Sequence, residues 1–303
     1  MIFVVILYLL FATTFTLGKA ALAYVTPFLF IGVRMMLGGS VLLFYTYFFS
    51  GKKISVHKKD YGAFLSIIMF HIFCSYTLEF WALEYVTSAK ACLLYNLSPF
   101  ISAVLAYSFF GEWLSLRQIS GLVIGFLGFI PILIAQSPLE QVAGHIGFLS
   151  CYEIALIVSV TSSAYGWIVM KELINKGYSF ILINGIGMTG GGILAFILSL
   201  AVEGWPVMRH GSQDIFALAA YSIALIIIAN IICYNLYGYL LSRYSPTFLS
   251  FAGFMTPLFA ALLGWVFLGE PVSWHFFATI VFVVAGLSLF HEKKPIIFEE
   301  KGL

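Results

Sequence analysis

Three polar side chains with chemistry of their own recur at four-residue intervals in one hydrophobic segment of the sequence. His71, Ser75 and Glu79 lie in the apolar run 61–85, and this spacing places them on one face of a helix. A carboxylate inside a segment that crosses a bilayer is expensive and usually functional, and a histidine titrates near neutral pH. The spacing predicts a polar stripe that faces the interior of a helix bundle and contacts a substrate.

Glu79 has three interpretations that the sequence leaves open. Counted along a helix, Glu79 lies roughly 9 Å below the outer surface, and Arg34 reaches a depth of roughly 10 Å in its own segment. Either the two side chains form a structural ion pair, or Glu79 binds a substrate ammonium or carries a proton, or it is an exposed carboxylate of the outer vestibule. His71 is either a titratable group of the site or a histidine that hydrogen-bonds a neighbouring helix.

Two prolines in later apolar runs indicate helix breaks. A proline inside a helix removes one hydrogen bond and displaces the carbonyl four residues back, and in lipid the freed carbonyl must face protein or a cavity. Pro99 and Pro257 are therefore predicted to be hinges of a transport site, unless they only shape packing. Tyr95 and Asn96, which lie one turn before Pro99, are the expected substrate contacts at this break.

The remaining candidates lie in two other segments. Asn230 and Tyr234 belong to the run 215–240, and Trp167 belongs to the run 147–170. Such residues also hold membrane helices together, so packing is the alternative role for each. The complete set of predicted substrate-binding residues is Glu79, His71, Ser75, Tyr95, Asn96, Trp167, Asn230 and Tyr234.

The composition is that of an all-α integral membrane protein. The 303 residues are 62% hydrophobic and 9% charged, whereas a soluble domain has about a quarter of its residues charged. Apolar runs of about 20 residues, the length that crosses a bilayer as a helix, recur along the chain. The predicted spans are approximately 2–22, 28–49, 61–85, 87–110, 115–135, 147–170, 178–202, 215–240, 246–268 and 272–291.

The chain also contains an internal duplication. The stretch LEYVTSAKACLLYNLSPFISAVLAYSFFGEW, residues 83–113, aligns without a gap with LSRYSPTFLSFAGFMTPLFAALLGWVFLGEP, residues 241–271. Pro99 aligns with Pro257, and the pair at 111–112 aligns with the pair at 269–270, Gly-Glu in both cases. Five helices per half place the second half upside down in the membrane, which predicts an inverted repeat. The expected units are a first repeat over 1–140, a second over 141–292 and a tail over 293–303.

Lysine and arginine positions predict the orientation of the chain. Eleven of the 15 Lys and Arg residues fall on the side that carries the chain termini. Because cytoplasmic loops carry an excess of these residues, both termini are expected in the cytoplasm, which puts the tail there too. The eleven are Lys52, Lys53, Lys58, Lys59, Arg117, Lys171, Lys176, Arg243, Lys293, Lys294 and Lys301.

These stretches together resemble the EamA family of the drug/metabolite transporter superfamily. Two stretches carry the resemblance. The first is FATTFTLGKAALAYVTPFLFIGVRMMLGGSVLL, residues 11–43, with Lys19 and Arg34. The second is residues 82–133, which contain small residues, a mid-helix proline and a Gly-Glu pair at the end of the helix. It covers nearly the whole chain. The resemblance implies ten helices, alternating access around a central cavity lined by both repeats, and a place in the bacterial inner membrane. Members mostly export amino acids and related metabolites, and some import nucleotide-like metabolites.

The predicted function is secondary transport of an amino acid or a related amine-bearing compound across the cytoplasmic membrane. S-Adenosylmethionine or a nucleotide-like metabolite is the alternative substrate, and a membrane channel or structural helix bundle is the alternative of another class. The sequence has no HExxH, GxSxG, Walker A or CxxC motif, so no enzyme, no cofactor and no metal site is expected. The expected partners are the lipid bilayer and a proton or counter-substrate, but not nucleic acid. A monomer is compatible with the sequence.

Overall fold

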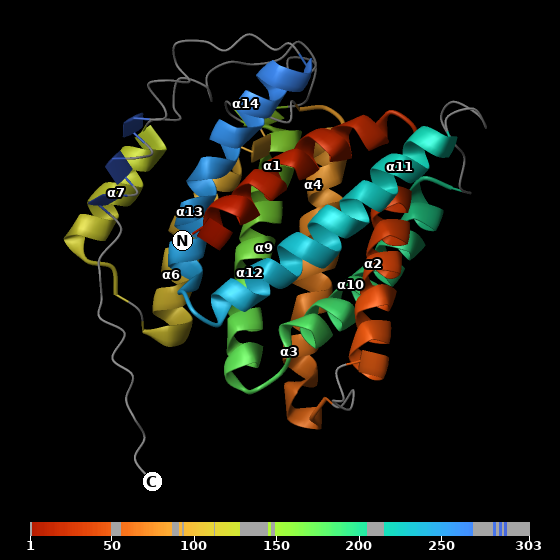
Figure 1. The fold of residues 1–303 in the computed structure, drawn as a ribbon, viewed down its shortest axis with the longest axis horizontal. Helices are drawn as coiled ribbons and strands as arrows, with labels where there is room; N and C mark the ends of the chain where they lie inside the picture. The colour runs from red at the N-terminus through yellow and green to blue at the C-terminus, as the bar shows by residue number, and fades with distance from the viewer. Residues whose placement is uncertain are drawn as a thin grey trace.

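The computed structural model describes residues 2–49, 56–86, 91–92, 94–111, 113–127, 145–146, 149–204 and 215–268, and 281–282, 285–286 and 288–289. These residues are helical almost throughout, and the bundle is shown in Figure 1. The exception is a short antiparallel pair of strands, β1 (His145–Ile146) and β2 (Leu149–Ser150). The tail over 293–303 and most of the predicted span 272–291 lie outside the described residues, as do Glu112, Gly269 and Glu270.

Six helices of the described chain are long and apolar enough to cross a membrane, so the protein is a multi-pass membrane protein. Their bounds lie within a few residues of six predicted spans, which confirms those predictions. Four of them are single helices: α1 (Ile2–Leu22), α2 (Pro27–Phe49), α9 (Cys151–Asn175) and α10 (Phe180–Val202). The other two are continuous runs of shorter pieces. One run consists of η1 (Lys58–Asp60), α3 (Tyr61–Ser66), η2 (Ile67–Cys74) and α4 (Ser75–Leu83), and the other of α11 (Ile215–Leu225), η6 (Ile226–Cys233) and α12 (Tyr234–Leu241).

Shorter helical pieces cover three further predicted spans. They are η3 (Tyr95–Leu97) with α6 (Ser98–Phe110), then α7 (Leu116–Leu127), then α13 (Pro246–Ala252), η7 (Gly253–Met255) and α14 (Thr256–Leu268). Helix α6 ends at Gly111, whose φ of 66° is left-handed and therefore suits glycine. In Figure 1, α1 and the run from α11 to α12 lie side by side across the front of the bundle.

The two proline-containing helices are broken in the same way. A three-residue 3₁₀ turn, η3 or η7, precedes an α-helix whose second residue is the proline, Pro99 in α6 and Pro257 in α14. Proline is tolerated there because the first N–H groups of a helix have no intrahelical partner. The predicted interruption is therefore present in both helices, and each proline starts a new helix after it.

A second conformational match links the third predicted span to the eighth. Each contains an eight-residue π-helical segment, η2 in one and η6 in the other, and the two segments are 159 positions apart. π-Helical turns are rare and appear mostly at functional sites. The third and eighth predicted spans thus share the same local departure from α-helical geometry.

Two lysines close the C-terminal ends of these same two spans. Lys19 Nζ donates a hydrogen bond to the carbonyl oxygen of Leu83 (3.1 Å) and another to that of Val86. Lys171 Nζ donates to the carbonyl oxygen of Leu241. The last carbonyls of a helix have no intrahelical partner and form the negative end of its dipole, so a cation stabilises them. The two lysines thus have the same structural role.

Helices α2 and α10 cross with their backbones in close contact. A Cβ atom built on Gly39 would lie 2.5 Å from the Thr189 nitrogen, and one built on Gly192 would lie 2.7 Å from the Met36 nitrogen. Small residues permit this approach between membrane helices. At one end of the pair, Glu203 accepts hydrogen bonds from the Phe28 and Leu29 nitrogens at 2.9 and 3.0 Å. These contacts fix the position of α2, the helix that carries Arg34.

Candidate functional site

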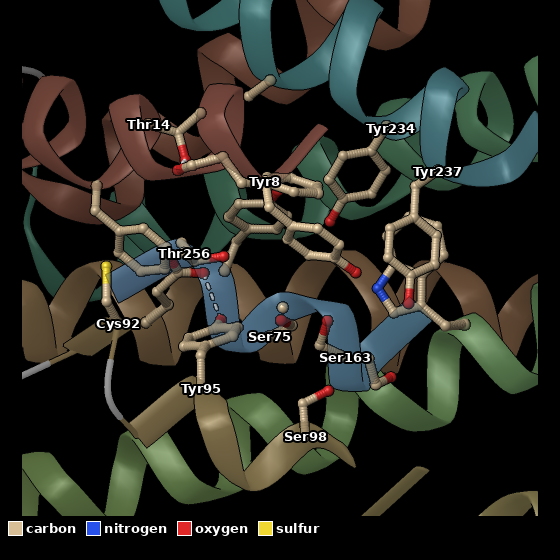
Figure 2. A pocket seen from close by; sticks show the side chains of 18 of the residues that line it. Tyr8, Thr14, Ser75, Cys92, Tyr95, Ser98, Ser163, Tyr234, Tyr237 and Thr256 are labelled. Atoms are coloured by element: carbon tan, nitrogen blue, oxygen red, sulfur yellow. Dashed lines mark hydrogen bonds between the residues drawn. The ribbon is translucent and has the colours of Figure 1, made fainter. Parts of the chain in front are cut away.

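A pocket opens in the centre of the bundle, where helices from both halves of the chain meet (Figure 2). Figure 2 shows Tyr8, Tyr234 and Tyr237 on one side of the pocket, and Tyr95 and Ser98 on the other. The described residues that line the pocket are Tyr8, Phe11, Thr14, Phe15, Arg34, Ser75, Tyr76, Glu79, Phe80, Cys92, Tyr95, Ser98, Ser163, Trp167, Ala229, Tyr234, Tyr237, Ser250, Gly253 and Thr256.

Glu79 is the one carboxylate among these lining residues. Its side chain is 8% exposed, so the interpretation as an exposed vestibule carboxylate is wrong. Tyr95 Oη donates a hydrogen bond of 2.7 Å to Glu79 Oε2. The Tyr95 hydroxyl also lies 3.0 Å from Ser159 Oγ, which in turn donates to the carbonyl oxygen of Ser75 at 2.7 Å. This network connects α4 to α9 and holds the carboxylate in place.

An aromatic wall forms another side of the pocket, and we define it as Trp167, Tyr234 and Tyr237. Trp167 stacks on Tyr237 with ring centroids 3.8 Å apart and an interplanar angle of 22°. The Tyr234 ring lies 5.1 Å from Trp167 in a tilted arrangement. Such rings offer flat apolar faces with negative π-density, which suit a planar ring or a cation.

Arg34 lines the same pocket but does not pair with Glu79. Its guanidinium carbon lies 5.6 Å from the Phe30 ring centroid, 5.1 Å from that of Tyr76 and 5.0 Å from that of Phe80. Within the described part of the chain, no ion pair of 4 Å or less joins Arg34 to Glu79. The sequence-based interpretation of Glu79 as a structural partner of Arg34 is therefore wrong for this conformation.

Five of the eight predicted substrate-binding residues line the pocket: Glu79, Ser75, Tyr95, Trp167 and Tyr234. They come from four different segments, and the fold brings them together around one cavity. Their role in binding a substrate remains a prediction.

The other three predicted residues are buried but do not line the pocket. His71 packs behind Trp167, with the ring centroids 4.3 Å apart, and neither of its ring nitrogens has a hydrogen-bond partner. The side chain lies against Gly166 of the neighbouring helix α9, and the predicted hydrogen bond to a neighbouring helix stays a prediction. Asn230 Nδ2 lies 2.8 Å from Met35 Sδ, and Asn96 is 2% exposed.

The π-helical segment explains why His71 leaves the polar stripe. The expected stripe assumed 3.6 residues per turn over its whole length. His71 lies in η2, where wider i→i+5 turns replace the α-helical ones, so four residues no longer complete a turn. Ser75 and Glu79 lie in the regular helix α4 and keep the expected spacing.

Sequence reasoning missed several tyrosines of the pocket. Tyr8 reaches the cavity from α1 and donates a hydrogen bond to the carbonyl oxygen of Leu249. Tyr76 also lines it. Tyrosine is ordinary in apolar helices, so no single-position signal distinguished these residues. The signal available for Tyr76 was its position three residues before Glu79 in the same helix.

The sequence matches the model of the EamA-like transporter family twice, over residues 1–134 and over residues 151–291. The chain belongs to the EamA-like transporter family. This confirms the resemblance to the drug/metabolite transporter superfamily that its motifs indicate. Membership of this family makes the protein a transporter.

The relatives that this chain resembles are also named as transporters. The chain is 30% identical over 287 residues to a protein of Chlamydia muridarum named S-adenosylmethionine/S-adenosylhomocysteine transporter, covering 94% of this chain and 89% of that one. A protein of Chlamydia trachomatis serovar L2 with the same name is also 30% identical, with 94% and 86% covered. The uncharacterized transporter YvbV of Bacillus subtilis is 24% identical, with 95% and 90% covered.

A solved structure titled "Crystal structure of protein" has the same fold. It superposes on this EamA-like chain with a TM-score of 0.74 over 94% of each chain, at 18% sequence identity. The likeness at this identity concerns the arrangement of the helices.

The hydrogen bond from Tyr95 to Glu79 predicts a specific loss of stability. Tyr95→Phe removes the only donor that the described chain gives Oε2 and leaves a buried carboxylate oxygen unsatisfied, which costs about 1–3 kcal/mol. The melting temperature of the purified protein in detergent is expected to fall. Tyr107→Phe, at an exposed tyrosine of α6, is the matched control and should leave it unchanged. Equal melting temperatures for the two variants would contradict this role of Tyr95.

Proposed function

We propose that this EamA-like protein carries S-adenosylmethionine and S-adenosylhomocysteine across a bacterial inner membrane. The sequence favoured an amino acid or related amine, with S-adenosylmethionine as the alternative. The names of the relatives from Chlamydia support the alternative better. At 30% identity these names guide the proposal, and the chemistry of the pocket supplies its physical argument.

The observation that carries the proposal is the combination of one buried carboxylate and an aromatic wall in a single pocket. S-Adenosylmethionine has an ammonium group, a sulfonium centre and a planar purine. Glu79 offers a charge-assisted hydrogen bond to the ammonium. The aromatic wall offers stacking to the purine and a cation–π contact to the sulfonium. A free amino acid with a small side chain would leave the wall without a matching group.

The proposed architecture is ten helices in two inverted repeats, over 1–140 and 141–292, with a tail over 293–303. The support is the set of matched features: two family-model matches, two π-helical segments, two broken helices and two lysine caps. Both termini are placed in the cytoplasm, because the Lys and Arg residues favour that side. A monomer fits this architecture, because both halves of the pocket come from one chain.

We place the hinges of alternating access at Pro99 and Pro257. Helix α6, which contains Pro99, touches α13, which precedes the break at Pro257, because Ser102 Oγ and Ser250 Oγ lie 2.7 Å apart in a buried hydrogen bond. Ser250 also lines the pocket. A change of angle at either break would therefore move a lining residue, which connects substrate occupancy to the opening of one side. A proton or a counter-substrate is the proposed coupling partner.

Ligand-induced stabilisation tests the substrate. S-Adenosylmethionine and S-adenosylhomocysteine are expected to raise the melting temperature of the purified protein, whereas methionine has a small effect because it cannot use the aromatic wall. Glu79→Gln keeps the shape but removes the charge, so affinity for S-adenosylmethionine should fall about 10- to 150-fold, the equivalent of a charged hydrogen bond.

Glu172→Gln is the matched control for this experiment. Glu172 pairs with Lys176 at 2.7 Å at the end of α9, outside the pocket, so its loss should leave ligand affinity unchanged. Stabilisation by methionine without any by S-adenosylmethionine or S-adenosylhomocysteine would contradict the proposed substrate and restore the amino-acid interpretation.

The hinge proposal concerns rates. Pro99→Ala and Pro257→Ala supply an N–H that can bond the carbonyl four residues back and stiffen the break, so exchange should slow more than binding weakens. Pro246→Ala, at the start of α13 after the ordinary N-cap Ser245, is the control and should exchange at the wild-type rate. Weaker binding with unchanged turnover in the first two variants would argue against hinges.

A further inference from the structure

Arg34 carries two hydrogen-bond donors that no described residue satisfies. The side chain is 2% exposed, and neither Nε nor Nη2 has a hydrogen-bond partner. Its close neighbours are the rings of Phe30, Tyr76 and Phe80. Ring faces attract the cation but do not replace oxygen acceptors for N–H groups in the guanidinium plane. A buried charge with unmet donors is costly, so an acceptor is expected in the functional state.

The described residues provide no such acceptor for Nε or Nη2. Arg34 also lines a second, lateral groove between α2, α10 and α11, but the described residues of that groove include no acid. In the central pocket, the carboxylate of Glu79 bonds Tyr95 and forms no ion pair with Arg34. The two opposite charges therefore line one cavity as separate groups, each able to meet a ligand.

We infer that Arg34 binds the carboxylate of the substrate's amino-acid portion while Glu79 binds its ammonium. This assignment rests on the proposed function and specifies which part of the substrate each charge recognises. A zwitterionic α-amino acid group places both charges on one carbon, and a pocket with one cation and one anion matches it. Guanidinium and carboxylate form two parallel hydrogen bonds, which lysine cannot reproduce.

The arrangement also gives the pocket a basis for selectivity. A nucleoside without the amino-acid portion would stack on the aromatic wall. It would give neither Arg34 nor Glu79 a group of opposite charge. Sites built to hydrogen-bond a substrate group reject analogues that lack it, because their buried polar groups remain unpaired. A direct Arg34–Glu79 ion pair would compete with both ends of the zwitterion, so their separation in this conformation suits ligand capture.

Decarboxylated S-adenosylmethionine isolates the role of Arg34, because it keeps the amine, sulfonium and adenosine and lacks only the carboxylate. Wild-type protein is expected to bind S-adenosylmethionine about 10- to 150-fold more tightly than this analogue, the equivalent of a charged hydrogen bond. The Arg34→Gln variant should lose that preference, because only its affinity for S-adenosylmethionine should fall. Arg243→Gln is the matched control, since Arg243 also packs on a ring, Tyr239 at 4.8 Å, but lies outside the pocket.

Each outcome of this titration decides the matter. Equal wild-type affinity for the two ligands overturns the assignment of Arg34, even if Arg34→Gln does not fold. A wild-type preference that Arg34→Gln retains, in protein with an unchanged melting temperature, also overturns it. If wild-type protein binds neither ligand, the proposed function fails and the assignment falls with it, whereas tight but equal binding of both leaves the proposed function intact.

Discussion

A charge buried inside a membrane-spanning bundle must be matched, because the bilayer core contains no water to solvate it. This protein holds two such charges in its central pocket, Glu79 and Arg34, and keeps them apart. Tyr95 holds the carboxylate, and aromatic rings hold the guanidinium. We propose that the pocket receives a ligand that carries both charges. Other features of the structure position these two side chains, and the proposed transport cycle would expose them to one side at a time.

The matched halves of the chain do that positioning. Lys19 and Lys171 close the ends of the two spans that contain the π-helical segments, and those spans carry much of the pocket lining. The close glycine-mediated crossing of α2 and α10 sets the depth of Arg34. Rigid elements thus hold the charged groups, while the broken helices with Pro99 and Pro257 supply the places where the proposed motion occurs.

Features encoded by local pattern were predictable from the sequence, and features that depend on packing were not. The long apolar runs gave the spans, and the duplicated prolines gave both helix breaks. Glu79 stood out because an acid is rare in such a run. The assumption of regular α-helical spacing gave the wrong position for His71, because no signal in the local sequence predicts a π-helical turn. The same reasoning paired Arg34 with Glu79 from equal depth, but depth does not specify rotation about the helix axis, and Arg34 packs among rings instead.

Counterflow in reconstituted liposomes tests most directly the claim that the pocket belongs to a carrier that exchanges two related substrates. Vesicles loaded with unlabelled S-adenosylhomocysteine should transiently accumulate labelled S-adenosylmethionine above its outside concentration. The initial rate should saturate with the outside concentration, and vesicles without an internal substrate should show no such overshoot. Uptake that ignores the internal load and rises linearly with outside concentration would contradict a carrier and indicate a channel.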